Sequence, residues 1–135
     1  MADGSRFDLD GYATYRKAMN EKILGSGHLG IKRFFNLDTQ AYLDGALPAR
    51  TKELLGLVAS AVLRCNDCID YHLIQCARHE VTDEELLEAL NVALIVGGSI
   101  VIPHLRRAVA LLDELTSDPS ANTDSRGSPP AAAPD

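Results

Sequence analysis

Residues 47–62, Leu-Pro-Ala-Arg-Thr-Lys-Glu-Leu-Leu-Gly-Leu-Val-Ala-Ser-Ala-Val, predict a buried helix. Pro48 is tolerated in a first helical turn, because the N–H that it lacks would have no partner there. Apolar residues then recur at steps of three and four from Leu54 to Val62, so they cover a wide face of the helix. A helix with such a broad apolar face needs other elements to pack against it.

The segments on both sides of this helix also have helical character. Gly and Pro fall mostly between the apolar stretches, and alternating β-branched residues are almost absent. Thr82-Asp83-Glu84-Glu85 is a capping box, in which the Thr82 hydroxyl caps the helix start and Glu85 reaches back. We therefore predict an all-α fold of about six helices, over residues 9–24, 29–43, 48–62, 67–79, 82–97 and from 100 or 103 to 115.

The composition is typical of a globular protein with neither nucleic acid nor a membrane as its partner. The chain has 135 residues, 46% of them hydrophobic, and a net charge of −6. A nucleic-acid backbone would call for a concentrated basic surface. The longest uncharged stretch, residues 89–103, is shorter than the ~20 apolar residues of a spanning helix. We find no signal-peptide pattern at the N-terminus, and we expect a cytoplasmic protein.

We expect one helical domain over residues 1–116, with its motif-bearing core at 48–115, and a disordered tail over 117–135. The tail is rich in Ser, Pro and Ala and has no aliphatic residue larger than Ala. Such a segment cannot bury enough apolar surface to offset the entropy lost on ordering.

The segment Cys65-Asn66-Asp67-Cys68-Ile69-Asp70-Tyr71-His72 carries the reactive side chains. A Cys-x-x-Cys pair indicates redox chemistry or metal binding, and it can close a disulfide if Cys65 lies at a turn entering a helix. A Cys68 thiolate in the first turn would be favoured by the helix dipole, which lowers the thiol pKa. His72 lies one turn further on the same face, where its imidazole can exchange a proton with the thiol. Glu53 can meet His72 only if the two helices fold back on each other or the chain breaks between them.

The same residues also allow less reactive interpretations. The two cysteines can be packing residues, since free Cys behaves as a small hydrophobe, and His72 can be a hydrogen-bonded structural histidine. Glu53 taken alone would be a surface carboxylate. Cys76 and His79 continue the stripe at helical spacing, which makes a zinc or iron site conceivable. Metal ligands usually come from two separated segments, so we favour core packing for Cys76.

Residues 48–115 resemble the carboxymuconolactone decarboxylase and alkylhydroperoxidase D (AhpD) family, in its cysteine-containing branch. That branch is marked by Glu-x11-Cys-x-x-Cys-x3-His, and this sequence matches every spacing. The residues that carry the resemblance are Glu53, Cys65, Cys68 and His72, followed by the segments 80–85 and 96–98.

The resemblance implies a helical fold that assembles into homo-oligomers, as trimers or hexamers. It also implies a thiol peroxidase, in which Cys68 attacks a hydroperoxide substrate and Cys65 resolves the product to a disulfide. Glu53 and His72 would form the proton relay. No bound cofactor is implied, because a thioredoxin-like or lipoyl-type dithiol protein would restore the thiols. AhpD itself has a histidine immediately before the second cysteine, whereas this chain has Asp67, whose carboxylate would raise the thiol pKa.

Two further functions stay open at this point. A carboxymuconolactone-decarboxylase-like enzyme would use Glu53 and His72 for acid–base chemistry without thiols. A metal-binding or structural oligomer would need no catalysis.

The apolar run over residues 90–102 predicts a helix that is buried on all sides, which suggests a subunit interface. His104, Arg106 and Arg107 follow this run in a new first turn. We interpret them as surface residues, with a place at a substrate entrance as the alternative.

Overall fold

The structure is a computed structural model that describes residue 4 and residues 6–117. The helices are α1 (Leu9–Gly25), α2 (Leu29–Ala41), α3 (Ala49–Leu63), α4 (Asn66–Arg78), α5 (Asp83–Gly97) and α6 (Ile102–Ser117), with a short 3-10 turn at Ser99–Val101. The described residues form no strand, so the all-α prediction is confirmed. The predicted disordered tail lies outside the described residues, apart from Ser117.

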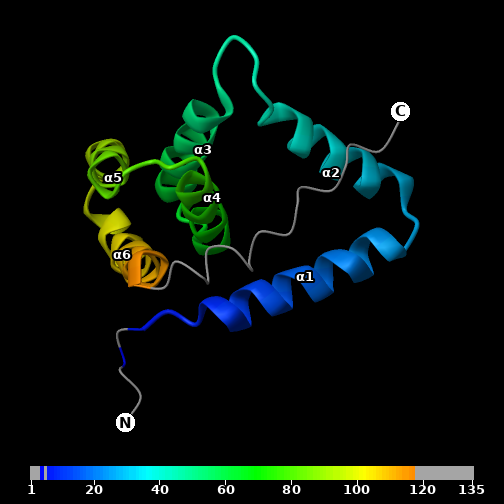
Figure 1. The fold of residues 1–135 in the computed structure, drawn as a ribbon, viewed down its shortest axis with the longest axis horizontal. Coiled ribbons are helices and arrows are strands. Elements are labelled where there is room, and N and C mark those ends of the chain that lie inside the picture. Colours follow the sequence, from blue (N-terminus) through cyan, green and yellow to red (C-terminus); the bar gives the residue numbers. More distant parts are fainter. Residues whose placement is uncertain (1–3, 5, 118–135) are drawn as a thin grey trace.

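Helices α3 to α6 pack together, and α1 and α2 form an arm beside them (Figure 1). Within the packed unit, α3 lies against both α4 and α5, and α4 lies against α6. Leu57 of α3, Leu73 of α4 and Leu111 of α6 are all 0% exposed. Burying a leucine side chain contributes about 1.5–3 kcal/mol. The hydrophobic core therefore lies between these four helices and not in the arm.

The start of α5 has the predicted capping box. The Thr82 hydroxyl accepts the Glu85 N–H at 3.2 Å, and the Glu85 carboxylate accepts the Thr82 N–H at 2.9 Å. Glu85 also forms an ion pair with Arg50 of α3. These contacts fix where α5 begins and hold that end beside α3.

The arm contacts the rest of the molecule at its two ends, and Arg16 of α1 also lies over the Tyr71 ring of α4. At the first end Leu9 is buried, and the Tyr12 hydroxyl donates to the carbonyl of Asp67 in α4 at 3.2 Å. At the other end, Tyr42 follows α2 and contacts His72 of α4. None of the residues of α2 is buried. The arm is therefore anchored to α4 at both ends, while most apolar side chains of α2 are exposed to solvent.

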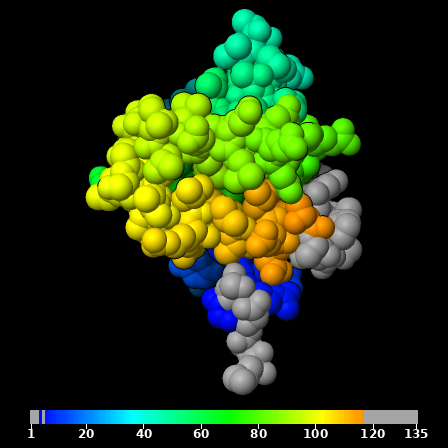
Figure 2. All heavy atoms as spheres, turned by 90° about the vertical axis from the view of Figure 1, so that its left-hand side faces the viewer, coloured from blue at the N-terminus to red at the C-terminus, as the bar shows by residue number. Residues whose placement is uncertain are grey.

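The prediction of a helix buried on all sides over residues 90–102 is wrong for the single chain. α5 ends at Gly97, since Gly98 has a φ of +80° that other residues rarely adopt. Ile95 and Val96 are 77% and 68% exposed. Helices α5 and α6 make up much of one face of the molecule, so only the inner stripe of α5 is covered (Figure 2). No described helix is long and apolar enough to cross a membrane.

Candidate active site

The candidate site is built on the hairpin of α3 and α4. Arg64 ends α3 with a φ of +62°, and α4 begins at Asn66 and runs back along α3. This reversal brings Glu53 and His72 together although they are 19 residues apart, with Oε2 of Glu53 at 2.7 Å from Nδ1 of His72. The condition set by the sequence, that the two helices fold back on each other, is therefore met.

The Glu53–His72 pair is shielded from solvent. Glu53 is 4% exposed and His72 is 7% exposed. A hydrogen bond to a carboxylate is shorter and stronger than one between neutral groups. With Nδ1–H donating to Glu53, the other ring nitrogen, Nε2, is left with a lone pair that can accept a proton. The surface interpretation of Glu53 is wrong, because the reversal of the chain at Arg64 buries it.

Tyr42 lies at that second ring nitrogen. Its hydroxyl oxygen is 3.5 Å from Nε2 of His72, and the two ring centroids are 5.2 Å apart. Burial raises the pKa of Tyr42, so the phenol stays protonated and can donate at neutral pH. Sequence reasoning missed Tyr42, since it lies before the motif and no spacing links it to His72.

Tyr71 borders the imidazole on another side. The rings of Tyr71 and His72 meet edge to face with centroids 5.2 Å apart. The guanidinium of Arg16, on the arm, lies 4.5 Å from the centre of the Tyr71 ring. Burial raises the pKa of Tyr71 as well, which keeps a second neutral phenol beside the site.

The two cysteines occupy the first turn of α4. Cys65 is the N-cap residue, and its Sγ accepts the backbone N–H of Cys68 at 3.4 Å. The two sulfurs form a disulfide. Cys68 is exposed, whereas Cys65 is only partly exposed. Both cysteines therefore lie at the positive end of the helix dipole, and Cys68 is the more exposed residue of the two.

Cys68 and His72 lie one turn apart on the same face of α4. In this disulfide form the hydrogen bonds recorded for His72 go to Glu53 and Tyr42, not to a sulfur. Asp67 is exposed in the first turn of α4. It does not cap the helix, because the N-cap residue is Cys65.

Cys76 and His79 do not join the site. Cys76 is 0% exposed, and burial raises the pKa of its thiol to about 12, so it remains protonated. His79 is exposed, just beyond the end of α4. In the described part of the chain, no three His, Cys, Asp or Glu residues are arranged to hold a metal ion. The geometry agrees with core packing for Cys76.

Two of the three residues interpreted as surface groups have specific partners. His104 is half-buried, and its Nδ1 lies 2.7 Å from Oδ1 of Asn66, the first residue of α4. Arg107 lies 3.5 Å from Oδ2 of Asp70. These contacts hold α6 against the helix that carries the cysteines. Arg106 and Arg107 are both exposed, as expected.

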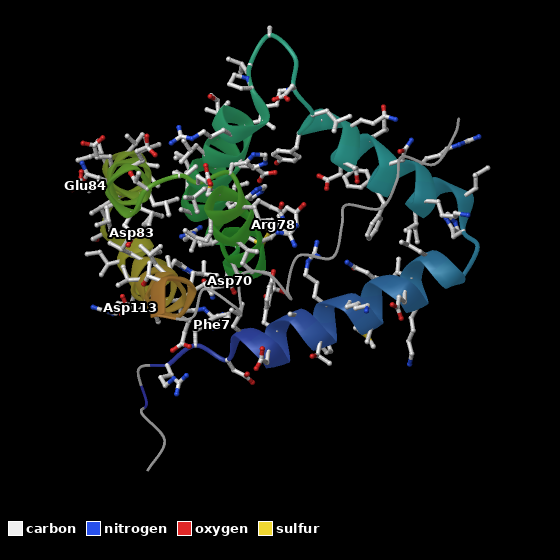
Figure 3. The ribbon with its side chains drawn as sticks, viewed as in Figure 1. Phe7, Asp70, Arg78, Asp83, Glu84 and Asp113 are labelled. Carbon is white, nitrogen blue, oxygen red and sulfur yellow. A yellow bond between two sulfur atoms is a disulfide. The ribbon has the colours of Figure 1, made fainter. Side chains whose placement is uncertain are left out.

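Asp70 is a buried carboxylate that sequence reasoning did not single out. It is 1% exposed, and its Oδ1 has no hydrogen-bond partner. Burial raises its pKa to about 6, and the nearby Arg107 partly opposes that shift. Figure 3 shows Asp70 at the end of α4 that lies toward Phe7 and the start of the arm.

The sequence profile of the carboxymuconolactone decarboxylase family matches residues 31–111, which is more than half of the chain. The chain belongs to this family. The region that matches the carboxymuconolactone decarboxylase profile runs from α2 into α6 and contains the whole α3–α4 hairpin.

Two crystal structures of one Thermotoga maritima protein resemble this family member closely. One is 53% identical with a TM-score of 0.79, covering 85% of this chain and 97% of that chain. The other is 58% identical with a TM-score of 0.77, covering 79% and 94%. The Thermotoga protein is described as a carboxymuconolactone decarboxylase family protein, and an involvement in antioxidative response has been suggested for it.

Two further proteins are similar at lower sequence identity. A carboxymuconolactone decarboxylase family protein from Legionella pneumophila is 25% identical with a TM-score of 0.70, covering 78% of this chain and 95% of that one. An uncharacterized protein of the cox locus in Paracoccus denitrificans is 34% identical over 82 residues, which is 61% of this chain and 74% of that protein.

Proposed function

We propose that this carboxymuconolactone decarboxylase family protein is a thiol-dependent hydroperoxide reductase that cycles through the Cys65–Cys68 disulfide. The observation that carries the proposal is that disulfide, at the start of the helix that carries His72, whose imidazole forms a buried pair with Glu53 of α3. The suggested antioxidative role of the 53% identical Thermotoga protein supports the same class of activity.

In the oxidising half of the cycle, Nε2 of His72 takes the proton of the Cys68 thiol, and Glu53 stabilises the imidazolium. The Cys68 thiolate attacks the hydroperoxide, the O–O bond breaks, and the departing oxygen leaves as an alcohol with that proton. Cys68 is then a sulfenic acid. The Cys65 thiol attacks its sulfur, which forms the disulfide and releases water. We assign the attack to Cys68 because it is the more exposed of the two cysteines.

In the reducing half, a thioredoxin-like or lipoyl-type dithiol protein donates two electrons. Its thiolate attacks the exposed sulfur of Cys68, and Cys65 leaves as a thiolate. Cys65 suits this role because its sulfur accepts the N–H of Cys68 and lies at the positive end of the helix dipole. The second thiol of the partner then releases Cys68. Such reductants keep thiols reduced in the cytoplasm, where we propose that the protein works.

We also propose that the protein works as a homo-oligomer, a trimer or a hexamer. Soluble monomers rarely expose large contiguous apolar patches. Among the apolar side chains that are more than half exposed, three lie on α2 and three on α5: Leu29, Phe34, Leu37, Val92, Ile95 and Val96. A second copy of the chain would cover these faces.

Acid–base catalysis by Glu53 and His72 alone is the second candidate function. Their hydrogen bond is complete without a contribution from either sulfur, so the pair could act on a lactone or a related acid. A double variant with Cys65→Ser and Cys68→Ser separates the two functions, because acid–base activity would persist in it and thiol peroxidase activity would not.

The proposal is tested by counting free thiols by intact mass before and after one equivalent of cumene hydroperoxide. The reduced protein is expected to lose the thiols of Cys65 and Cys68 and to keep that of Cys76. Cys68→Ser should prevent this loss, whereas the control Cys76→Ala should preserve it. A wild-type protein that keeps all its thiols would contradict the proposal. Metal analysis of the same sample tests the metal-binding alternative.

A further inference from the structure

Gly56 of α3 lies directly against the imidazole of His72. A Cβ atom at position 56 would lie 2.5 Å from Cε1 of His72 and 2.8 Å from each ring nitrogen. Cβ atoms in proteins essentially never come closer than 3.0 Å to non-bonded heavy atoms of other parts of the chain. Any other residue at this position would therefore force the ring to move.

The backbone does not explain why glycine occurs here. Gly56 lies in the middle of α3, and the described glycines with a positive φ are Gly27 and Gly98. A glycine inside a helix makes a protein less stable than an alanine would, because glycine loses more conformational freedom on folding. The reason for a glycine at position 56 must therefore lie in what packs against it.

Gly56 and Glu53 are three residues apart, so they lie on the same face of α3. Glu53 holds Nδ1 of His72 at 2.7 Å, and Gly56 leaves free the space that the ring occupies. Tyr42 and Tyr71 border the ring elsewhere. The imidazole is thus confined by its neighbours, and its contact with α3 requires a residue without a side chain.

We propose that Gly56 is a positioning residue, which provides the space in which the His72 imidazole meets Glu53 at Nδ1 and keeps Nε2 available for proton transfer. Its importance for turnover rests on the proposed function. Its effect on the ring depends on the contacts alone.

The test compares Gly56→Ala with the control Gly25→Ala, at the last residue of α1, where a Cβ would meet nothing within 4 Å. In the wild-type protein, NMR should detect a slowly exchanging, downfield imidazole N–H, assigned to His72 by its loss in His72→Ala. We expect this signal to disappear in Gly56→Ala and to persist in Gly25→Ala. We expect the rate of hydroperoxide-dependent thiol loss to fall about 100-fold in Gly56→Ala, since small displacements of catalytic groups have effects of this size.

A double variant separates this role from a general packing role. In Gly56→Ala with His72→Ala, the new methyl group enters the space that the ring has left. We expect this double variant to melt at a higher temperature than His72→Ala alone, which also covers the case in which Gly56→Ala alone fails to fold. A packing role unrelated to the imidazole would instead lower the melting temperature in both backgrounds.

The proposal is overturned if Gly56→Ala keeps the His72 signal and the wild-type rate. It is also overturned if the double variant melts below His72→Ala. If the signal is lost in Gly56→Ala but the wild-type protein loses no thiols to peroxide, the positioning role stands and the proposed function fails.

Discussion

At the scale of single residues, the chemistry depends on how the imidazole of His72 is held. Glu53 binds Nδ1, and the other nitrogen faces the Tyr42 hydroxyl at 3.5 Å. This arrangement selects one tautomer and leaves Nε2 as the basic atom. In the proposed mechanism, the carboxylate therefore acts through the histidine.

Replacing the carboxylate should slow the thiol chemistry. Glu53→Gln keeps the shape of the side chain but removes the charge that stabilises the imidazolium. We expect the rate of hydroperoxide-dependent thiol loss to fall about 100-fold, at the lower end of what general acid–base catalysis contributes. Stopped-flow mixing with cumene hydroperoxide measures this rate. The control is Glu88→Gln on the exposed side of α5, and equal rates in the two variants would refute the role of Glu53.

Asp70 should make the stability of the protein depend on pH. Its pKa of about 6 in the fold exceeds the ordinary aspartate value of 3.8. Between these values the folded protein retains a proton that the unfolded chain has released, so stability falls as the pH rises. We expect a decrease on the order of 2 kcal/mol from this group across that window.

Urea unfolding of wild-type protein and Asp70→Asn at pH 4 and pH 7 measures this contribution. The decrease should be smaller in Asp70→Asn, while Asp113→Asn, at an exposed position of α6, should behave as wild type. The same pH dependence in all three proteins would mean that Asp70 is not the titrating group.

The sequence predicted part of this candidate site and missed the rest for a physical reason. Glu53 and His72 could be predicted because they belong to a pattern with fixed spacing along the chain. Tyr42, Gly56 and Asp70 act through contacts between helices, and these depend on how the helices are rotated and which face each one presents. Periodicity in a single sequence does not define those rotations closely enough.

At the scale of elements, the helix starts are specified by local interactions. The capping box at Thr82 was predictable, because its partners are three residues apart. The chain reversal at Arg64, with a φ of +62°, was not, since Arg has no preference for that conformation.

Removing the cap of α5 should destabilise the protein modestly. Thr82→Ala deletes the hydroxyl that accepts the Glu85 N–H, and we expect a loss of about 1 kcal/mol in the free energy of unfolding. The matched control is Thr116→Ala in the last turn of α6, whose hydroxyl only donates to carbonyls of its own helix. Thermal unfolding compares the two, and a Thr82→Ala protein as stable as the control would contradict the prediction.

The cysteine at the start of α4 allows a similar test in the reduced protein. A serine hydroxyl can accept the N–H that the sulfur of Cys65 now accepts. We therefore expect Cys65→Ser to unfold close to the reduced wild-type protein and Cys65→Ala to lose about 1 kcal/mol. Equal stabilities of the two variants would show that the sulfur contributes nothing as a cap.

At the scale of the whole molecule, the exposed apolar side chains of α2 and α5 lead us to expect self-association in solution. We expect sedimentation to show a homo-oligomer, and Phe34→Asp, at a position 69% exposed on α2, to shift it toward monomers. The exposed Lys17→Asp on α1 is the control for a change of charge. Unchanged helicity by circular dichroism would show that the fold survives, and a monomeric wild-type protein would contradict the expectation.

The short chain distance between Glu53 and His72, 19 residues, also bears on the order of folding. Closing a short loop costs less entropy than closing a long one, and local contacts generally form sooner. We expect α3 and α4 to pair early, before α6 docks. During synthesis, we then expect the Glu53–His72 pair to form soon after residue 78 leaves the ribosome, while the residues of α5 and α6 are still to be translated.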